Sequence, residues 1–166
     1  VGQEALRSLA RVAGEDPVPA LLHRLLRAEN DTAREAAAKA LAAAARRAPD
    51  RETPAATIAA SLPSLDLERQ GWALRALGRV GGTTALGAVR TALNGTDPAR
   101  REAAVRALAE WPDAAAGDDL LAVVKTSPEA RLRVLALRGY VRLVREAPDL
   151  TPANRLAMLQ EALQAA

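Results

Sequence analysis

The sequence contains no cysteine, no phenylalanine, one tyrosine, two tryptophans and one histidine among 166 residues. The absence of cysteine excludes disulfide bonds and cysteine-ligated metal sites. A single histidine excludes a histidine-rich zinc site. No apolar run approaches the ~18 residues that a membrane-spanning helix needs. We therefore expect no metal, no cofactor and no membrane partner.

Alanine and leucine dominate what is present, with 41 and 25 residues respectively. Both residues lie at the top of the helix propensity scale, so the composition favours an all-α protein. The chain carries 23 basic and 20 acidic residues, a net charge of +3, and 21 of the basic residues are arginine. Because the excess is small, the positions of the arginines matter more than their sum.

One helical pattern recurs five times along the chain. Each copy begins with alanine, has leucine or tyrosine four residues later, and has another apolar residue three residues further on. These offsets place the three positions on one face of an α-helix. The columns are Ala5, Ala37, Ala73, Ala104 and Ala136; Leu9, Leu41, Leu77, Leu108 and Tyr140; and Val12, Ala44, Val80, Trp111 and Leu143. The copies start 32, 36, 31 and 32 residues apart, which indicates a repeated structural unit.

A shorter apolar pattern lies between these helices and predicts one further helix in each repeat. Its stripes are Val18, Leu21, Leu22, Leu25 and Leu26; Ile58, Leu62 and Leu65; Leu86, Val89 and Leu93; Leu120, Leu121 and Val124; and Leu156, Leu159 and Leu163. Proline is favoured in the first turn of a helix, which is the place we expect for Pro17, Pro54, Pro98, Pro128 and Pro152. The expected N-caps are Asp16, Asp97, Ser127 and Thr151.

Helix pairs repeated in register predict an α-solenoid, in which each repeat contacts only its neighbours. We expect residues 1–166 to form a single domain of about five helical hairpins. The first repeated helix has no shorter helix before it, and the last shorter helix has no partner after it. We therefore expect an exposed apolar face at each end, and we interpret the chain as a fragment of a longer protein whose other domains cover these faces.

Two segments carry a resemblance to a known family. Residues 97–109, Asp-Pro-Ala-Arg-Arg-Glu-Ala-Ala-Val-Arg-Ala-Leu-Ala, and residues 31–42 resemble HEAT repeats, specifically the bacterial HEAT-like type first named from phycobilisome lyases. Residues 68–81 and 127–140 match more loosely. The resemblance implies that Arg34, Arg101 and Arg133 each bond an acidic group in the neighbouring turn, whereas Gln70 departs from this pattern. It also implies that the second helix of each pair lines a concave groove.

The outward positions of the second helices are rich in basic residues. A helical wheel places Trp72, Arg75 and Arg79 opposite the packed side of their helix. One outward column is basic in all five copies and consists of Arg7, Lys39, Arg75, Arg106 and Arg138. A second column consists of Arg11, Ala43, Arg79, Glu110 and Arg142. Two interpretations stay open: a basic groove that binds an acidic partner, or a solvated face with local ion pairs to Glu35, Glu102 and Glu110.

Trp72 also has two interpretations. Its equivalents in the other copies are Glu4, Ala36, Ala103 and Leu135, so the position does not require a large core side chain. An exposed Trp72 beside Arg75 and Arg79 would be an interface anchor with cation–π support. Alternatively, it covers the gap left by the 36-residue repeat. Trp111 and Tyr140 stand in core columns and are interpreted as structural, and His23 as an exposed helix residue.

The resulting functional hypothesis is a non-enzymatic scaffold that binds an acidic protein or peptide through its concave face. The predicted binding residues are Arg7, Lys39, Trp72, Arg75, Arg79, Arg106, Arg138 and Arg142. One alternative is nucleic-acid binding through the same basic stripe, as in a DNA-binding or DNA-repair module. The other is a lyase or glycosylase of the HEAT-like type, which a concave acidic residue beside Trp72 would favour. No segment offers a catalytic or phosphate-binding motif.

Overall fold

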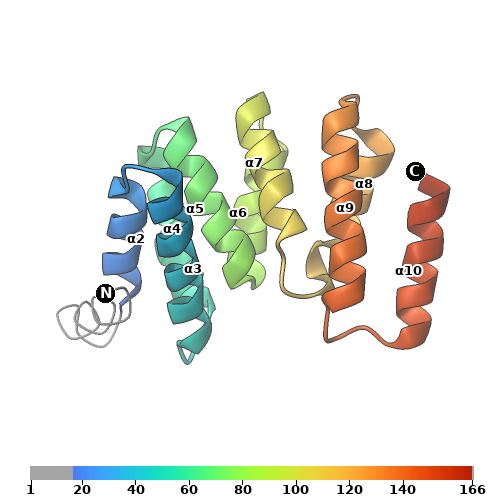
Figure 1. The fold of residues 1–166 in the computed structure, drawn as a ribbon, viewed down its shortest axis with the longest axis horizontal. Helices are drawn as coiled ribbons and strands as arrows, with labels where there is room; N and C mark the ends of the chain where they lie inside the picture. The colour runs from blue at the N-terminus through green and yellow to red at the C-terminus, as the bar shows by residue number, and fades with distance from the viewer. Residues whose placement is uncertain (1–16, 166) are drawn as a thin grey trace.

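The computed structural model describes residues 17–165, which form nine α-helices, two short 3₁₀ helices and no β-strand (Figure 1). The α-helices are α2 (Val18–Arg27), α3 (Asp31–Arg47), α4 (Glu52–Ser61), α5 (Leu67–Val80), α6 (Thr83–Leu93), α7 (Pro98–Ala109), α8 (Gly117–Thr126), α9 (Ala130–Glu146) and α10 (Pro152–Ala165). The 3₁₀ helices are η1 (Leu62–Ser64) and η2 (Ala114–Ala116). The predicted all-α class is confirmed, whereas Ala5, Arg7, Leu9, Val12 and Asp16 lie outside the described residues.

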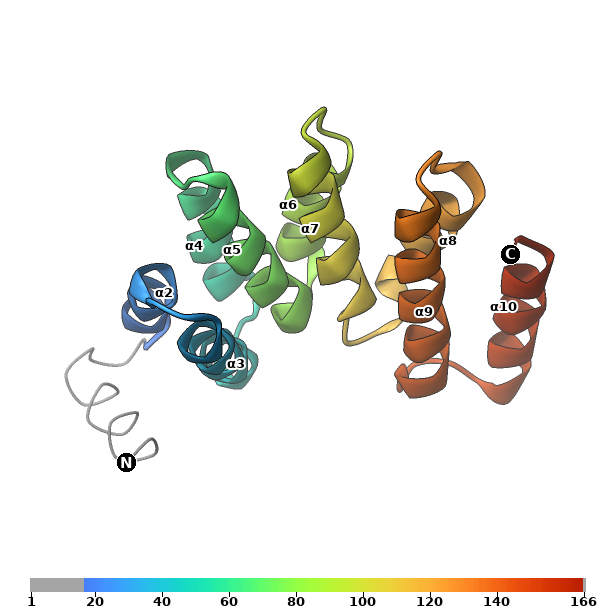
Figure 2. The same ribbon diagram turned by 45° about the horizontal axis from the view of Figure 1, so that its top comes forward.

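The helices are arranged as successive pairs along one row. The second helices of the pairs, α3, α5, α7 and α9, each pack against the next one in the row. The first helices α2, α4, α6 and α8 lie on the other side, and the two views show α6 and α8 behind α7 and α9 (Figures 1 and 2). The predicted repeat architecture, an α-solenoid, is therefore confirmed for residues 17–165.

The alanine column occupies equivalent buried sites in the described repeats. Ala37, Ala73, Ala104 and Ala136 are all buried, three of them completely. The column four residues later is also buried, and its members are Leu41, Leu77, Leu108 and Tyr140. The predicted register of the repeats is thus confirmed, and it fixes which side chains of each second helix point away from the core.

Glycine allows two pairs of second helices to approach closely. A Cβ atom placed on Gly78 of α5 would overlap the backbone of Ala107 on α7, and one placed on Gly139 of α9 would overlap the Cβ of Ala109. Gly78 and Gly139 are buried. Small residues at facing positions therefore set how near α7 lies to both of its neighbours.

Several predicted helix starts are confirmed by capping hydrogen bonds. The Asp97 carboxylate accepts from the Arg100 N–H at 2.8 Å, and the Thr151 hydroxyl oxygen accepts from the Asn154 N–H at 3.2 Å. Asp66 caps α5 in the same way, at 2.8 Å from the Arg69 nitrogen. Such caps satisfy N–H groups that have no partner within the helix.

The prediction that Pro128 lies in the first turn of a helix is wrong. α9 begins two residues later, at Ala130, and its N-cap residue Glu129 has an extended backbone. The Ser127 hydroxyl oxygen accepts from the Glu129 N–H at 3.3 Å, which closes a tight turn before the helix. Serine and proline form such turns as readily as they begin helices, so the sequence alone did not separate the two outcomes.

The arginine column implied by the family resemblance bonds mainly to carbonyl groups. Arg34 makes the expected acidic contacts, to Asp31 at 3.1 Å and to Glu68 at 2.6 Å. Arg133 instead donates to the carbonyl oxygens of Ser127 and Pro128, at 3.0 and 3.2 Å.

Gln70 and Arg101 complete this column. Gln70 donates to the carbonyl oxygens of Leu62 and Leu65, at 3.0 and 2.8 Å, and so binds the turn before its helix as Arg133 does. The Arg101 side chain makes no hydrogen bond or ion pair within residues 17–165. Within residues 17–165 a continuous arginine–acid ladder is therefore not formed, because Gln70 and Arg133 bind carbonyl groups and Arg101 has no side-chain partner.

The last helix is held by hydrogen bonds from Arg155 to carbonyl oxygens at the end of α9, by the Lys125–Glu161 ion pair and by Tyr140, and it leaves leucines exposed. The Tyr140 hydroxyl donates to the Met158 carbonyl oxygen at 3.3 Å, which gives this core tyrosine its polar partner. Leu156, Leu159 and Leu163 of α10 are 59%, 37% and 81% exposed. The predicted apolar face is thus confirmed at this end of the row.

A charge placed in the alanine column should prevent folding. We expect Ala73→Asp to destabilise the protein by about 3–5 kcal/mol, because the site is completely buried and offers the carboxylate no partner. Ala56→Asp on the exposed side of α4 is the control and should leave the unfolding midpoint nearly unchanged. Urea unfolding followed by circular dichroism measures both, and equal midpoints would contradict the packing described here.

The close contact between α7 and α9 gives a second prediction. Gly139→Ala should lower the free energy of unfolding by about 1–3 kcal/mol, because the new methyl group has no room beside Ala109. Gly87→Ala on α6 is a matched change in open space and should raise stability by roughly 0.5–1 kcal/mol through helix propensity. Thermal unfolding of both variants tests the contrast; a stabilised Gly139→Ala protein would show that the helices are not in contact.

Candidate interaction face on the second helices

Side chains that point away from the core on α3, α5, α7 and α9 form one face, which we call the second-helix face. The predicted residues on it are Lys39 on α3, Trp72, Arg75 and Arg79 on α5, Arg106 on α7, and Arg138 and Arg142 on α9. Arg7 lies outside the described residues. The repeat register thus brings residues that are far apart in sequence onto neighbouring helices.

The centre of this face is an ion-pair cluster rather than a row of free cations. Arg79 contacts Glu35 of α3 at 2.7 Å and Glu110, just after α7, at 2.6 Å. Arg75 contacts Glu110 at 2.8 Å and Glu35 at 3.6 Å. Two glutamates therefore hold two arginines between them, and we call these four residues the central ion-pair cluster. For Arg75 and Arg79, the interpretation with local ion pairs is confirmed.

The cluster corrects the expected exposure of Arg79. The helical wheel placed Arg79 on the outward face, but its side chain is only 15% exposed because acidic groups from both neighbouring helices close over it. Burial opposes the charge of Arg79, yet its hydrogen bond to Glu35 and its interactions with Glu110 outweigh that effect and raise the pKa of Arg79. A helical wheel describes one helix alone, so it could not show that acidic side chains from neighbouring repeats cover Arg79.

The same contacts keep Glu35 ionised. Burial alone would raise the pKa of Glu35, but the hydrogen bond from Arg79 and the positive charges of Arg79 and Arg75 lower it below its ordinary value of 4.5. Glu35 is therefore an anion at neutral pH with cationic partners already in place. This arrangement joins α3, α5 and the end of α7, which belong to three successive repeats.

Trp72 stands between two hollows beside this cluster. One hollow, of about 730 Å³, lies between α3 and α5, and the other, of about 310 Å³, lies between α5 and α7. Trp72 and Arg75 line both. The Arg75 guanidinium carbon is 5.1 Å from the centre of the Trp72 ring, within the range of a cation–π contact.

The Trp72 side chain is neither fully exposed nor completely buried. The ring is half-buried and packs against the core, so it fills space between neighbouring second helices. Its remaining surface faces the two hollows. The equivalent residues on the neighbouring helices α3 and α7 are the small Ala36 and Ala103. The larger Trp72 ring therefore forms a ridge between them.

Cations outnumber anions where the face passes from α7 to α9. Arg106 and Arg131 both contact Glu102, at 2.6 and 2.9 Å, so one carboxylate serves two guanidinium groups. Arg138 is exposed and has no ion pair or hydrogen bond from its side chain in the part of the chain that the structure describes. The uncompensated positive charge of the second-helix face therefore lies here and not at Arg75 and Arg79.

Arg142 is bound within the protein. It donates to the carbonyl oxygens of Ala109 and Trp111, at 2.7 and 2.8 Å, and contacts Glu146 at 2.7 Å. These bonds satisfy carbonyl groups at the end of α7, which would otherwise have no partner. The sequence analysis predicted Arg142 as a binding residue and missed its structural role. It also left Arg131 out of the face, although Arg131 lies seven residues before Arg138 and so shares its helix face.

An acidic residue does lie beside Trp72, as the enzyme alternative requires. Glu35 and Trp72 line the same hollow, but Glu35 is ionised and held by Arg79.

Within residues 17–165, no three His, Cys, Asp or Glu side chains are grouped so that they could hold a metal ion. None of the described helices combines the length and apolarity needed to span a membrane.

The paired helices, their regular register and their continuous row define a helical repeat protein of the α-solenoid class. A family model for HEAT repeats matches residues 54–139, slightly more than half of the chain. The chain therefore belongs to the HEAT-repeat family, whose domains are generally protein-interaction scaffolds and usually non-catalytic. Searches of curated proteins and of solved structures gave no significant match.

The central ion-pair cluster predicts a specific dependence of stability on pH. Because the pKa of Glu35 is lower in the folded protein, its ionised form stabilises the fold above pH 4.5, and this contribution is lost as the pH falls through the folded pKa. We expect Glu35→Gln to be about 1 kcal/mol less stable than the parent protein at neutral pH, a value that allows for its partial exposure. The difference should shrink below pH 4.5.

Urea unfolding of the parent protein and of Glu35→Gln between about pH 3 and pH 7 measures this effect. Glu29→Gln is the control, because Glu29 is exposed and makes no ion pair in the described part of the chain. A Glu35→Gln deficit that stays the same at every pH would contradict the prediction.

Proposed function

We propose that the chain binds an extended acidic segment of a partner protein across its second-helix face. The observation that carries this proposal is the position of Trp72, which stands with Arg75 between two hollows in the middle of the face. A half-buried tryptophan bordered by hollows can insert between partner side chains, and such residues dominate the binding energy of many interfaces.

Charge supports an acidic partner of limited length. Arg106 and Arg131 share a single anion, Glu102, and the exposed Arg138 has no ion pair in the described part of the chain, so this region offers positive charge beside the Trp72 ridge. Four second helices spaced about 8–10 Å apart span roughly 30 Å. A fully extended peptide of roughly ten residues covers the same length. The partner we infer places an apolar side chain against Trp72 and acidic side chains toward α7 and α9.

The central ion-pair cluster argues against nucleic acid as the main ligand. Phosphate groups along the middle of the face would compete with Glu35 and Glu110, which already bind Arg75 and Arg79. Few cations therefore remain for phosphate contacts, whereas nucleic-acid affinity depends on neutralising several phosphates. Nucleic-acid binding is kept as an outcome of the test below.

We further propose that the chain is not an enzyme. Glu35, which lines one hollow with Trp72, is ionised and its Oε1 accepts a hydrogen bond from Arg79, so it has no proton to donate as a general acid. Glu68 and Glu102, which line the other hollow with Trp72, are paired with Arg34 and Arg106. HEAT-repeat domains are usually non-catalytic, and no enzyme family was identified.

Selection from a displayed library of random peptides of roughly ten residues, the length that matches the face, tests the proposal. We expect enriched peptides to combine an apolar residue with acidic residues. Their affinity, measured by fluorescence anisotropy, should fall at least about tenfold with Trp72→Ala, the loss typical of an interface anchor. It should also fall with Arg106→Glu combined with Arg138→Glu, because charge complementarity is reversed.

The control for the charge reversal is Arg24→Glu combined with Arg27→Glu. Both arginines are exposed on α2 and lie off the second-helix face, so the change in net charge is the same. Equal losses from the two double variants would show that only net charge matters and would overturn the proposal. Tight binding of a single-stranded oligonucleotide that falls steeply with salt and survives Trp72→Ala would favour the nucleic-acid alternative instead.

A further inference from the structure

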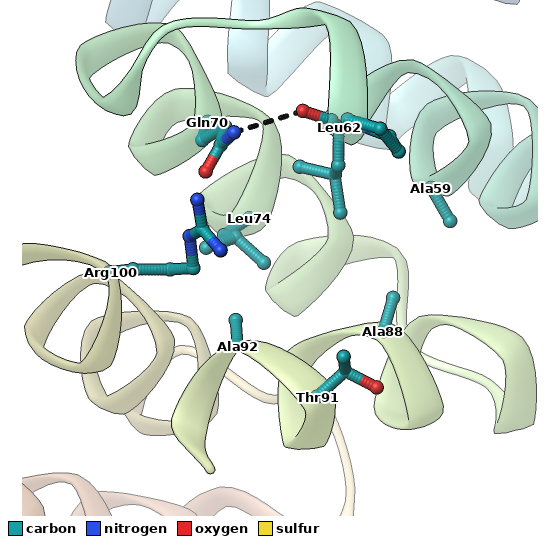
Figure 3. A pocket seen from close by; sticks show the side chains of 9 residues that line it. Ala59, Leu62, Gln70, Leu74, Ala88, Thr91, Ala92 and Arg100 are labelled. Atoms are coloured by element: carbon teal, nitrogen blue, oxygen red, sulfur yellow. Dashed lines mark hydrogen bonds between the residues drawn. The ribbon is translucent and has the colours of Figure 1, made fainter. Parts of the chain in front are cut away.

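A cavity lies on the other side of the row, away from the second-helix face. It has a volume of about 490 Å³, is open to solvent on one side, and is lined by residues of α4, η1, α5, α6 and the start of α7. Figure 3 shows Leu62, Leu74 and Ala92 among the side chains that surround it. Most of the lining is apolar, and a volume of this size falls in the range of small-molecule sites, about 300–1,000 Å³.

Arg100 is the charged group of this cavity. Its side chain extends from α7 toward Gln70 and Leu74 (Figure 3). Its guanidinium makes no ion pair and donates no hydrogen bond within residues 17–165, and its Nε atom is buried without an acceptor. The other two arginines with a buried unbonded nitrogen, Arg75 and Arg79, are both held by glutamates.

The surroundings of Arg100 leave its charge without compensation. Among residues 17–165, no acidic side chain lines the cavity. Gln70 does not supply an alternative donor for a ligand, because its amide nitrogen already donates to the carbonyl oxygens of Leu62 and Leu65. The Arg100 guanidinium has no acceptor within residues 17–165, and an incoming anion would provide one for its terminal nitrogens, which are not among the buried atoms.

We propose that this cavity binds a small carboxylic acid with an apolar tail. The carboxylate pairs with the Arg100 guanidinium, which can offer two parallel N–H donors to its two oxygens. The tail packs against Leu62, Leu74 and Ala92, whose surfaces are apolar. The site is separate from the second-helix face, so this inference does not depend on the partner proposed above.

Octanoate is a suitable probe because it combines the carboxylate with an unbranched apolar tail. Isothermal titration calorimetry should show octanoate binding the parent protein at one site and at least about tenfold more tightly than 1-octanol, which has the tail without the charge. Acetate, which has the charge without the tail, should bind far more weakly than octanoate. Arg100→Gln should remove the preference for octanoate over octanol.

The neighbouring arginine provides a matched control. Arg101 lies on the same helix, lacks a side-chain partner in the described part of the chain, and lines a different hollow, so Arg101→Gln should keep the preference. Ala88→Phe, which fills the cavity from a half-exposed position on α6, should weaken octanoate and octanol alike. Circular dichroism confirms that each variant is folded.

Three results would overturn the proposal. The first is the absence of octanoate binding at millimolar concentration, and the second is equal affinity of the parent protein for octanoate and octanol. The third is octanoate binding that survives both Arg100→Gln and Ala88→Phe, which would place the probe elsewhere, for instance on the exposed leucines of α10.

Discussion

Glycine and alanine face each other where the second helices approach most closely. Gly78 of α5 lies against the backbone of Ala107, and Gly139 of α9 lies against Ala109, so α7 contacts both neighbours with almost no side chain between. The buried alanine column extends the same principle along the row. With no phenylalanine in the chain, stability comes from close packing of small groups, which gains dispersion energy through many short contacts.

Close helix packing also determines which charged side chains of the second-helix face are paired. When neighbouring helices are near, long charged side chains on one reach across to the next, and Arg79 meets Glu35 and Glu110 in this way. The charges of Arg75 and Arg79 are consequently matched by Glu35 and Glu110, while positive charge remains near Arg106 and Arg138 and at Lys39, which shares Glu35. Trp72 has only alanines at the equivalent flanking positions and projects as a ridge. The proposed partner segment follows from this uneven distribution of charge and shape.

The sequence was sufficient to predict the fold because the repeat places the same residue types at the same structural positions. Ala73, Ala104 and Ala136 recur at buried sites as their columns predict. The charged contacts were not predictable in the same way, because Glu35 and Arg79 are 44 residues apart and become neighbours only through the distance between helices. The Arg100 cavity lay beyond sequence reasoning altogether, since its walls come from five separate elements. The position of Pro128 was mispredicted because proline is favoured both in turns and in the first turn of a helix.

A double-mutant cycle between Ala109 and Gly139 tests the close packing of the second helices most directly. Urea unfolding would be measured for the parent protein, Gly139→Ala, Ala109→Gly and the double variant. If the two residues are in contact, removing the Ala109 methyl group relieves the nearer of the two overlaps of the methyl group added at position 139, while the overlap with the Ala109 Cα at 2.7 Å remains. The double variant should then be more stable than the sum of the single changes, with a coupling of about 0.5–3 kcal/mol. Strictly additive effects would contradict the account, because they would show that α7 and α9 do not meet at these residues.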